Sequence, residues 1–314
     1  IIPSDAIIIM NETKIKTPNE DEFLSLSRLL PIGTLEQCIF NYERGILLYS
    51  LIAKYKPKTV LEIGTATGYS TLCMARAMYD FQIPGKIYTI DPESINRKIE
   101  LISNTDLQIK EIISLKDHWS KIAPPEWLTK IELITGYSGK VMSTYEFPKI
   151  EFAYIDGAHF FEAVKHDFYA ILKVVSDEFN ILFDDYTPGL YPNGVAKLID
   201  EEVSQLFTVT VIDTDLEKRY HQIKQAYDYK DKSKIFHAMC LIQSKSLKRS
   251  LDEITSDPII NKDLKKYRRY EKRWILRRNL NQKIPFLKKI ALLIRQPRVS
   301  NINKFSSIYL NQTQ

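Results

Sequence analysis

The chain has 314 residues, of which 44% are hydrophobic and 26% charged, as in an ordinary globular protein. No apolar run approaches the ~20 residues that cross a bilayer, so a membrane-spanning helix is not expected. The three cysteines, Cys38, Cys73 and Cys240, lie far apart. This spacing argues against a disulfide framework or a zinc site and favours a reducing, cytoplasmic location.

The net charge of +5 is unevenly distributed along the chain. Residues 258–314 contain 15 Lys/Arg against Asp263 and Glu271, a net charge of +13, which leaves −8 for residues 1–257. A mildly acidic body with a strongly basic tail predicts that the tail meets an anionic partner.

Apolar periodicity divides the chain into three parts. Residues 1–44 are expected to be mainly helical, with a stripe at Leu35, Ile39, Tyr42, Ile46 and Tyr49 that continues into the next part. In residues 45–247, strand-like runs alternate with helical patterns, which predicts an α/β fold with a doubly wound, mostly parallel seven-stranded sheet. Residues 248–314 are expected to form a basic amphipathic helical tail.

The expected strands are Thr59–Ile63, Lys86–Ile90, Lys130–Thr135, Glu151–Ile155, Asn180–Phe183, Phe207–Ile212 and Phe236–Ile242. The expected helices are at about 68–79, 94–103, 138–145, 160–175 and 194–204. No convincing helix separates the last two strands, so these are predicted to form an antiparallel edge pair. Residues 92–130 are long for one crossover and contain Trp119 and Trp127, so this excursion either caps a pocket or packs on the surface.

The turn after the first strand carries the clearest functional signal. Gly64 and Gly68 flank it, and glycine lets a ligand lie against the backbone. Ala66 breaks the dinucleotide pattern Gly-x-Gly-x-x-Gly, and no lysine of the P-loop type follows, which disfavours a nicotinamide oxidoreductase. Asp91 ends the second strand at the spacing of an acid that bonds ribose hydroxyls. Glu62, inside the first strand, is an unusual acid that would bond turn amides or a cationic amino group.

The segment LEIGTATGYS (61–70) resembles motif I of class I S-adenosylmethionine (SAM)-dependent methyltransferases. The nearest likeness, over roughly Gly45–Ser244, is to metal-dependent O-methyltransferases of the catechol and caffeoyl-CoA type and of the macrolide-sugar and cephalosporin-tailoring type. The resemblance implies a Rossmann-like methyltransferase fold and SAM as cofactor, with Asp91 bonding the ribose. The cofactor-binding residues expected from motif I and the later strand ends are Glu62, Gly64, Thr65, Gly68, Ser70, Asp91, Gly136, Tyr137, Ser138 and Asp156.

Two further strands end in acids. FAYIDGAH (152–159) places Asp156 and His159 after the fourth strand, and ILFDDY (181–186) places Asp184 and Asp185 after the fifth. The carboxyl ends of neighbouring parallel strands point at one crevice, so the three carboxylates are expected to converge and to bind a hard cation, Mg²⁺ or Mn²⁺. The resemblance gives the same metal ligands.

His159 and Asp156 are the candidate catalytic residues, with His159 as a base or acceptor-orienting group. The alternatives are a helix cap or solvated loop for Asp184 and Asp185, and a structural histidine for His159. Asp167 is read as a surface or helix-packing acid. Tyr186 and Tyr191, in the following Pro/Gly-rich loop, either stack on an acceptor or anchor the loop.

In the tail, Leu264, Tyr267, Trp274 and Ile275 recur at helical spacing among basic residues, and the second segment 284–295 is apolar with embedded positive charge. Basic amphipathic helices lie on anionic membranes. The alternatives are docking on the catalytic domain, docking on a second copy in a homodimer, or contact with nucleic acid phosphates.

Together these patterns predict a SAM-dependent O-methyltransferase, assisted by a divalent metal, that acts on a hydroxyl of a small molecule or glycan. One rival is an RNA methyltransferase guided by the basic tail, disfavoured because no Asn/Asp-Pro-Pro-Tyr-like segment follows the fourth strand. A second rival is a non-catalytic scaffold that retains the methyltransferase fold.

Overall fold

The computed structural model describes residues 42–102, 110–186, 193–213 and 238–283. The chain divides into two units, residues 1–267 and residues 268–314, and each is described by itself. The predicted stripe positions Leu35 and Ile39 and the tail segment 284–295 lie outside the described residues.

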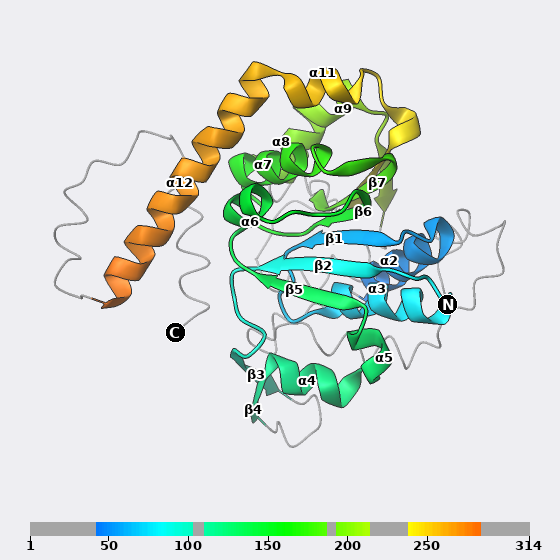
Figure 1. The fold of residues 1–314 in the computed structure, drawn as a ribbon, viewed down its shortest axis with the longest axis vertical. Helices are drawn as coiled ribbons and strands as arrows, with labels where there is room; N and C mark the ends of the chain where they lie inside the picture. The colour runs from blue at the N-terminus through cyan, green and yellow to red at the C-terminus, as the bar shows by residue number, and fades with distance from the viewer. Residues whose placement is uncertain (1–41, 103–109, 187–192, 214–237, 284–314) are drawn as a thin grey trace, which may run out of the picture. The chain divides into compact units, whose positions relative to one another are not determined.

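Seven strands form one sheet in the order β5-β2-β1-β6-β7-β9-β8 (Figure 1). The five strands from β5 to β7 pair in parallel, whereas β9 is antiparallel to both β7 and β8. This arrangement confirms the mostly parallel sheet and the antiparallel edge pair. The strands are β1 (Thr59–Ile63), β2 (Lys86–Asp91), β5 (Ile131–Thr135), β6 (Ile150–Ile155), β7 (Val175–Tyr186), β8 (Thr210–Asp213) and β9 (Ala238–Gln243).

Side chains of the central strands alternate between two cores, one on each face of the sheet. On β6, Phe152 and Tyr154 belong to one core, and Ala153 and Ile155 to the other. Successive residues of a strand point to opposite faces, so a strand covered on both sides is apolar throughout. This burial explains why the sheet was visible in the sequence as continuous apolar runs.

Helices cover both faces (Figure 1). One core is completed by α2 (Tyr42–Tyr55), α3 (Tyr69–Asp80), α4 (Leu115–Ile122) and α5 (Pro125–Leu128). The other is completed by α6 (Ser138–Thr144), α7 (Phe161–Leu172), α8 (Val195–Leu198), the π-helical turn η3 (Ile199–Val203), α9 (Ser204–Leu206) and α11 (Leu251–Ser256). The doubly wound prediction is therefore correct.

The prediction of a helix at 94–103 is wrong. The chain there turns and forms β3 (Lys98–Ile102), which pairs with β4 (Lys110–Ser114) as a separate antiparallel sheet. Ile99 and Leu101 alternate with charged residues, a period of two that favours a strand once a partner strand is present. The strand expected at Phe207–Ile212 is also shorter, because β8 begins at Thr210 and Phe207 makes only an isolated bridge to Leu247.

Helix α12 (Pro258–Lys283) follows α11 and begins at a proline, the residue best suited to a first helical position. Within residues 1–267, Ile254 and Leu264 are buried in the core beside α7. Lys165 of α7 bridges Glu202 at 2.8 Å and Asp263 at 3.1 Å. The beginning of the basic segment is thus packed on the sheet domain. Across the described parts of the chain, no helix combines the length and apolarity that crossing a bilayer requires.

Candidate active site

The turn after β1 brings two strand ends into backbone contact. Gly64 has φ +99° and Gly68 has φ +91°, values in the left-handed region that favours glycine. A Cβ atom on Gly64 would lie 2.1 Å from the carbonyl oxygen of Asp156. No larger residue fits at position 64, so the turn lies directly against Asp156, the residue that follows β6.

Trp119 of α4 packs on the same turn. Its Nε1 donates a hydrogen bond of 2.7 Å to the carbonyl oxygen of Thr67. A Cβ atom on Gly68 would lie 2.1 Å from the Trp119 ring, which explains the second glycine. The excursion 92–130 therefore reaches the turn rather than packing only at the surface.

Glu62 is buried in β1, and its carboxylate accepts hydrogen bonds from three hydroxyl groups. The donors are Ser70 and Thr71 of α3 and Thr89 of β2, the last at 2.6 Å. Burial raises the pKa of Glu62, and these hydroxyl donors partly offset the rise. Glu62 thus joins β1, β2 and α3 beneath the turn, and its two oxygens are engaged within the protein.

Asp91, at the end of β2, holds the turn from the other side. Its Oδ2 accepts from the amide of Ala66 at 2.9 Å, and its Oδ1 accepts from the amide of Glu93 at 2.8 Å. Arg97 lies 3.3 Å from Oδ1 and also donates to the Ala66 carbonyl oxygen. Gly136 at the end of β5 donates its amide to the Asp91 carbonyl oxygen at 2.8 Å. Asp91 and the segment 136–138 therefore lie at one sheet edge.

Three carboxylates gather at the ends of β6 and β7, where Ile155 is paired with Phe183. The pairing of β7 with β9 is interrupted after Phe183, and Asp185 takes the left-handed conformation with φ +54°. Such a bulge redirects side chains. As a result, neighbouring Asp184 and Asp185 meet different partners: Asp184 is buried, and Asp185 is partly exposed.

Arg44 of α2 bridges two of these carboxylates. Its Nη1 lies 3.1 Å from Asp156 Oδ2, and its Nη2 lies 2.5 Å from Asp184 Oδ2. The buried hydroxyl of Tyr154 donates to the same two oxygens, at 3.2 Å and 3.0 Å. Burial alone would lower the pKa of Arg44, but Asp184, Tyr154 and Asp156 raise it well above its usual value.

His159 follows Asp156 by three residues and pairs with the third carboxylate, with Nδ1 2.7 Å from Asp185 Oδ2. Burial alone would lower its pKa, but Asp185 raises the pKa of His159 to about 9. Burial raises the pKa of Asp156 well above its usual value, and Asp184 and Asp185 add to the rise, although Arg44 lowers it. The cluster thus gathers three carboxylates around two basic side chains, Arg44 and His159.

Asp156, His159 and Asp185 are the residues that a cation would meet. One ligand atom from each lies within 4.8 Å of the others. This is close to the separation of about 4 Å expected for opposite ligands of an Mg²⁺ ion.

Residues 61–186 match the family described as "Methyltransferase domain". This segment runs from β1 to the end of β7 and contains the turn, Asp91 and the three carboxylates. Over these residues the chain is similar to methyltransferase domains. The match supports the methyltransferase resemblance expected from the sequence, and the seven-stranded, mostly parallel sheet confirms the expected fold.

Solved structures similar to this chain include O-methyltransferases. TomG from Streptomyces achromogenes, involved in tomaymycin synthesis and in complex with SAM, is 15% identical with a TM-score of 0.45, and the match covers 75% of this chain and 94% of that chain. The O-methyltransferase from Bacillus cereus, in complex with S-adenosylhomocysteine (SAH), is 14% identical with a TM-score of 0.45, and the match covers 77% and 99%. No curated protein sequence matches the chain.

Sequence reasoning missed three residues of the candidate site: Arg44, Tyr154 and Arg97. Arg44 lies 112 residues before its partner Asp156, so no local pattern connects them. Tyr154 is two residues before Asp156 in a strand and therefore shares its face, a signal that was available. Arg97 was assigned to a helix that does not form.

Several predicted residues have structural partners. The Tyr186 hydroxyl donates to Asp200 at 2.8 Å, which favours the loop-anchoring alternative. Asp167 is buried, and its Oδ1 lies 3.1 Å from Nδ1 of the buried His166, so it is a helix-packing acid. Tyr191 lies outside the described residues.

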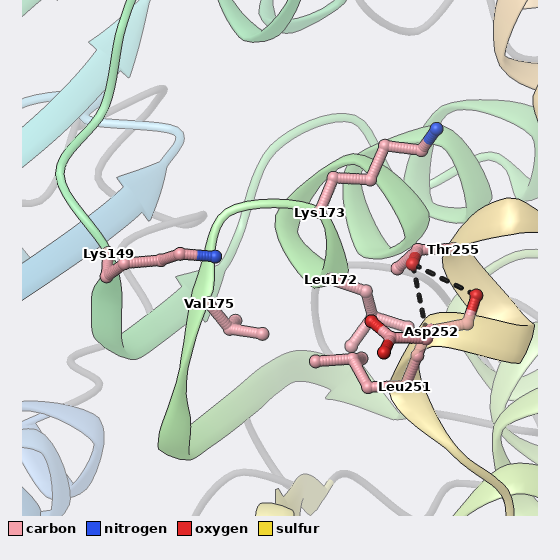
Figure 2. Close-up of a pocket in the computed structure, with 7 residues that line it drawn as sticks. All are labelled: Lys149, Leu172, Lys173, Val175, Leu251, Asp252 and Thr255. Carbon is pink, nitrogen blue, oxygen red and sulfur yellow. Dashed lines mark hydrogen bonds between the residues drawn. The ribbon is translucent and has the colours of Figure 1, made fainter.

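A small cavity lies between the turn after β1 and Asp156. It is lined by Arg44, Gly64, Thr65, Ala66, Thr67, Tyr69, Ser70 and Asp156. A larger cavity of about 280 Å³ lies at the opposite edge of the sheet, where Lys149 precedes β6 and Val175 begins β7 (Figure 2). Because ligands of parallel sheets bind at the carboxyl ends of the strands, we assign the active site to the small cavity.

Proposed function

We propose that this chain is a SAM-dependent O-methyltransferase that methylates a hydroxyl group of a small molecule or glycan. The observation that carries the proposal is the contact between Gly64 and Asp156. It joins the turn expected to bind the donor to the carboxylate cluster expected to bind the acceptor. Donor and acceptor held at such a contact are positioned for direct transfer.

The donor end of the site suits a nucleoside without phosphates. The two glycines leave the backbone of the turn open to a ligand, and Asp91 stands where ribose hydroxyls would meet a carboxylate. SAM donates its methyl group from a positively charged sulfonium sulfur. The neighbouring carboxylates supply a negative field that compensates this charge. Its methyl group needs little activation, so the acceptor hydroxyl is the partner that requires help.

The cluster fits a divalent cation, Mg²⁺ or Mn²⁺. Asp156 and Asp185 supply the carboxylate oxygens that these cations prefer, and the His159 imidazole lies beside them as a third possible ligand. Asp184, expected from the sequence as a third ligand, has Arg44 as its partner instead. When bound, such a cation would lower the pKa of an acceptor hydroxyl and hence favour its attack on the methyl group.

His159 has a second candidate role as general base, because Asp185 fixes its Nδ1 as a triad carboxylate does. The two roles predict different results for His159→Asn. If His159 is a cation ligand, its replacement would lower the Mn²⁺ affinity. If His159 is only a general base, its replacement would slow turnover and leave the Mn²⁺ affinity as in the wild type.

The proposal is tested by calorimetry with SAH, followed by transfer from methyl-labelled SAM to a panel of catechols, sugars and RNA. We expect SAH to bind, label to enter a hydroxyl acceptor, and EDTA to suppress transfer until Mg²⁺ is restored. Absence of SAH binding would favour the scaffold alternative. Label entering only RNA would favour the RNA methyltransferase alternative.

We further propose that the basic helix contacts an anionic membrane surface. Residues 268–283 carry seven Lys/Arg against Glu271 alone. Trp274 and Leu276 are exposed between these charges, and apolar side chains among cations suit a lipid interface better than phosphates alone. Full-length protein should sediment with phosphatidylserine vesicles but not with phosphatidylcholine vesicles. Reversing Lys272 and Arg273 to Glu should release it. Unchanged sedimentation would contradict the proposal.

A further inference from the structure

We propose that Arg44 is a positioning residue that decides which carboxylates can hold the cation. By pairing with Asp184, it removes that carboxylate from the ligand set and leaves Asp156, His159 and Asp185. This inference rests on the proposed function, because it concerns the same cluster.

The geometry gives Arg44 a fixed place. One guanidinium reaches across the ends of two neighbouring strands and contacts Oδ2 of Asp156 and Oδ2 of Asp184. The Tyr154 hydroxyl donates to the same two oxygens. Arg44 and Tyr154 thus hold the two carboxylates together, although the single Tyr154 proton is donated to only one oxygen at a time, and Asp156 differs from Asp184 in being partly exposed. The guanidinium is planar and permanently charged, so this arrangement is directional.

Charge balance points the same way. Arg44 lies against two of the three carboxylates, His159 pairs with the third, and Asp184, whose side chain is 0% exposed, is the most deeply buried of the three. A buried carboxylate requires a partner, and the guanidinium of Arg44 is the closest cation to Asp184 that the described residues supply. Asp156 and Asp185 are partly exposed, and these are the acids that lie together with His159.

Mn²⁺ binding to the full-length protein, measured by electron paramagnetic resonance without donor or acceptor, tests the inference. Arg44→Gln frees Asp184 to join the ligand set, so we expect Mn²⁺ to bind about tenfold more tightly, since affinity rises with the number of charged ligands. Asp184→Asn should leave the Mn²⁺ affinity within about threefold of the wild type, whereas Asp185→Asn should weaken it by more than about tenfold.

The double variant Arg44→Gln/Asp184→Asn removes both charges together and should restore the wild-type affinity. Arg76→Gln is the matched control, because Arg76 also pairs with an aspartate, Asp80, but within α3 and outside the site. Its Mn²⁺ affinity should not change.

Unchanged or weaker Mn²⁺ binding in Arg44→Gln would overturn the inference, as would equal losses in Asp184→Asn and Asp185→Asn. If Arg44→Gln fails to fold, Asp184→Asn still tests whether Asp184 lies outside the ligand set, and a loss of Mn²⁺ affinity equal to that of Asp185→Asn overturns the inference. SAH affinity is measured on the same samples. If SAH binds but the Mn²⁺ affinities of the variants differ from those expected, only the role of Arg44 is overturned. If the wild type does not bind SAH, the proposed function is overturned.

Discussion

Replacing Asp185 by Asn is expected to abolish methyl transfer while leaving donor binding intact. Asn tolerates the left-handed conformation at this position, with φ +54°, so the bulge in β7 should persist. The substitution removes the charge that pairs with His159 and one of the expected cation ligands. Loss of an acid–base or ligand group of this kind costs about 10²–10⁴-fold in rate.

The measurement is initial rates with an acceptor found in the labelled-donor screen, together with SAH affinity by calorimetry. Asp252→Asn is the control, since Asp252 is an exposed acid on α11 that lines the larger cavity away from the cluster. A variant of Asp185 that turns over normally, or that loses SAH binding as severely as turnover, would contradict the assigned role.

Replacing Asp91 by Ala is expected to have the opposite effect, because it should weaken donor binding directly. Hydrogen bonds to a charged group contribute about 1.5–3 kcal/mol, so SAH should bind roughly 10–100-fold more weakly. The carboxylate also accepts the Ala66 amide, and part of the loss will come from a looser turn. Asp91→Asn keeps an oxygen acceptor for that amide and separates the two contributions.

Calorimetry on both Asp91 variants, beside Asp185→Asn, checks this expectation, and thermal unfolding shows whether the turn has loosened. Intermediate SAH affinity in Asp91→Asn would show that the turn and the ribose contact both matter. Equal SAH affinity in the Asp91→Ala and Asp185→Asn variants would count against the division of the site into a donor end and an acceptor end.

The sequence was sufficient for features that depend on local pattern. Strands buried on both faces appear as apolar runs, and Asp91, Asp156 and Asp184 mark the ends of three of them. Because parallel strands present their carboxyl ends at one edge, convergence of these acids followed from topology alone. The glycine positions in the turn were also readable, although the contacts that require them, with Asp156 and Trp119, were not.

Features that depend on tertiary contacts were not readable. The bulge at Asp185 sends two adjacent acids to different partners, and a sequence of two aspartates does not show which one turns. Arg44 lies on a helix before the sheet, far along the chain from Asp156, and its role emerges only when α2 packs beside β6. The β3–β4 pair formed where a helix was expected, because pairing between strands outweighed the local pattern.

The most direct test of the central claim is a crystal structure of the protein soaked with SAH and Mn²⁺, in which anomalous scattering locates the ion. We expect the ion between Asp156, His159 and Asp185, and the ribose of SAH on Asp91, with both ligands meeting at the Gly64 turn. An ion bound elsewhere, or SAH bound away from this turn, would contradict the shared site.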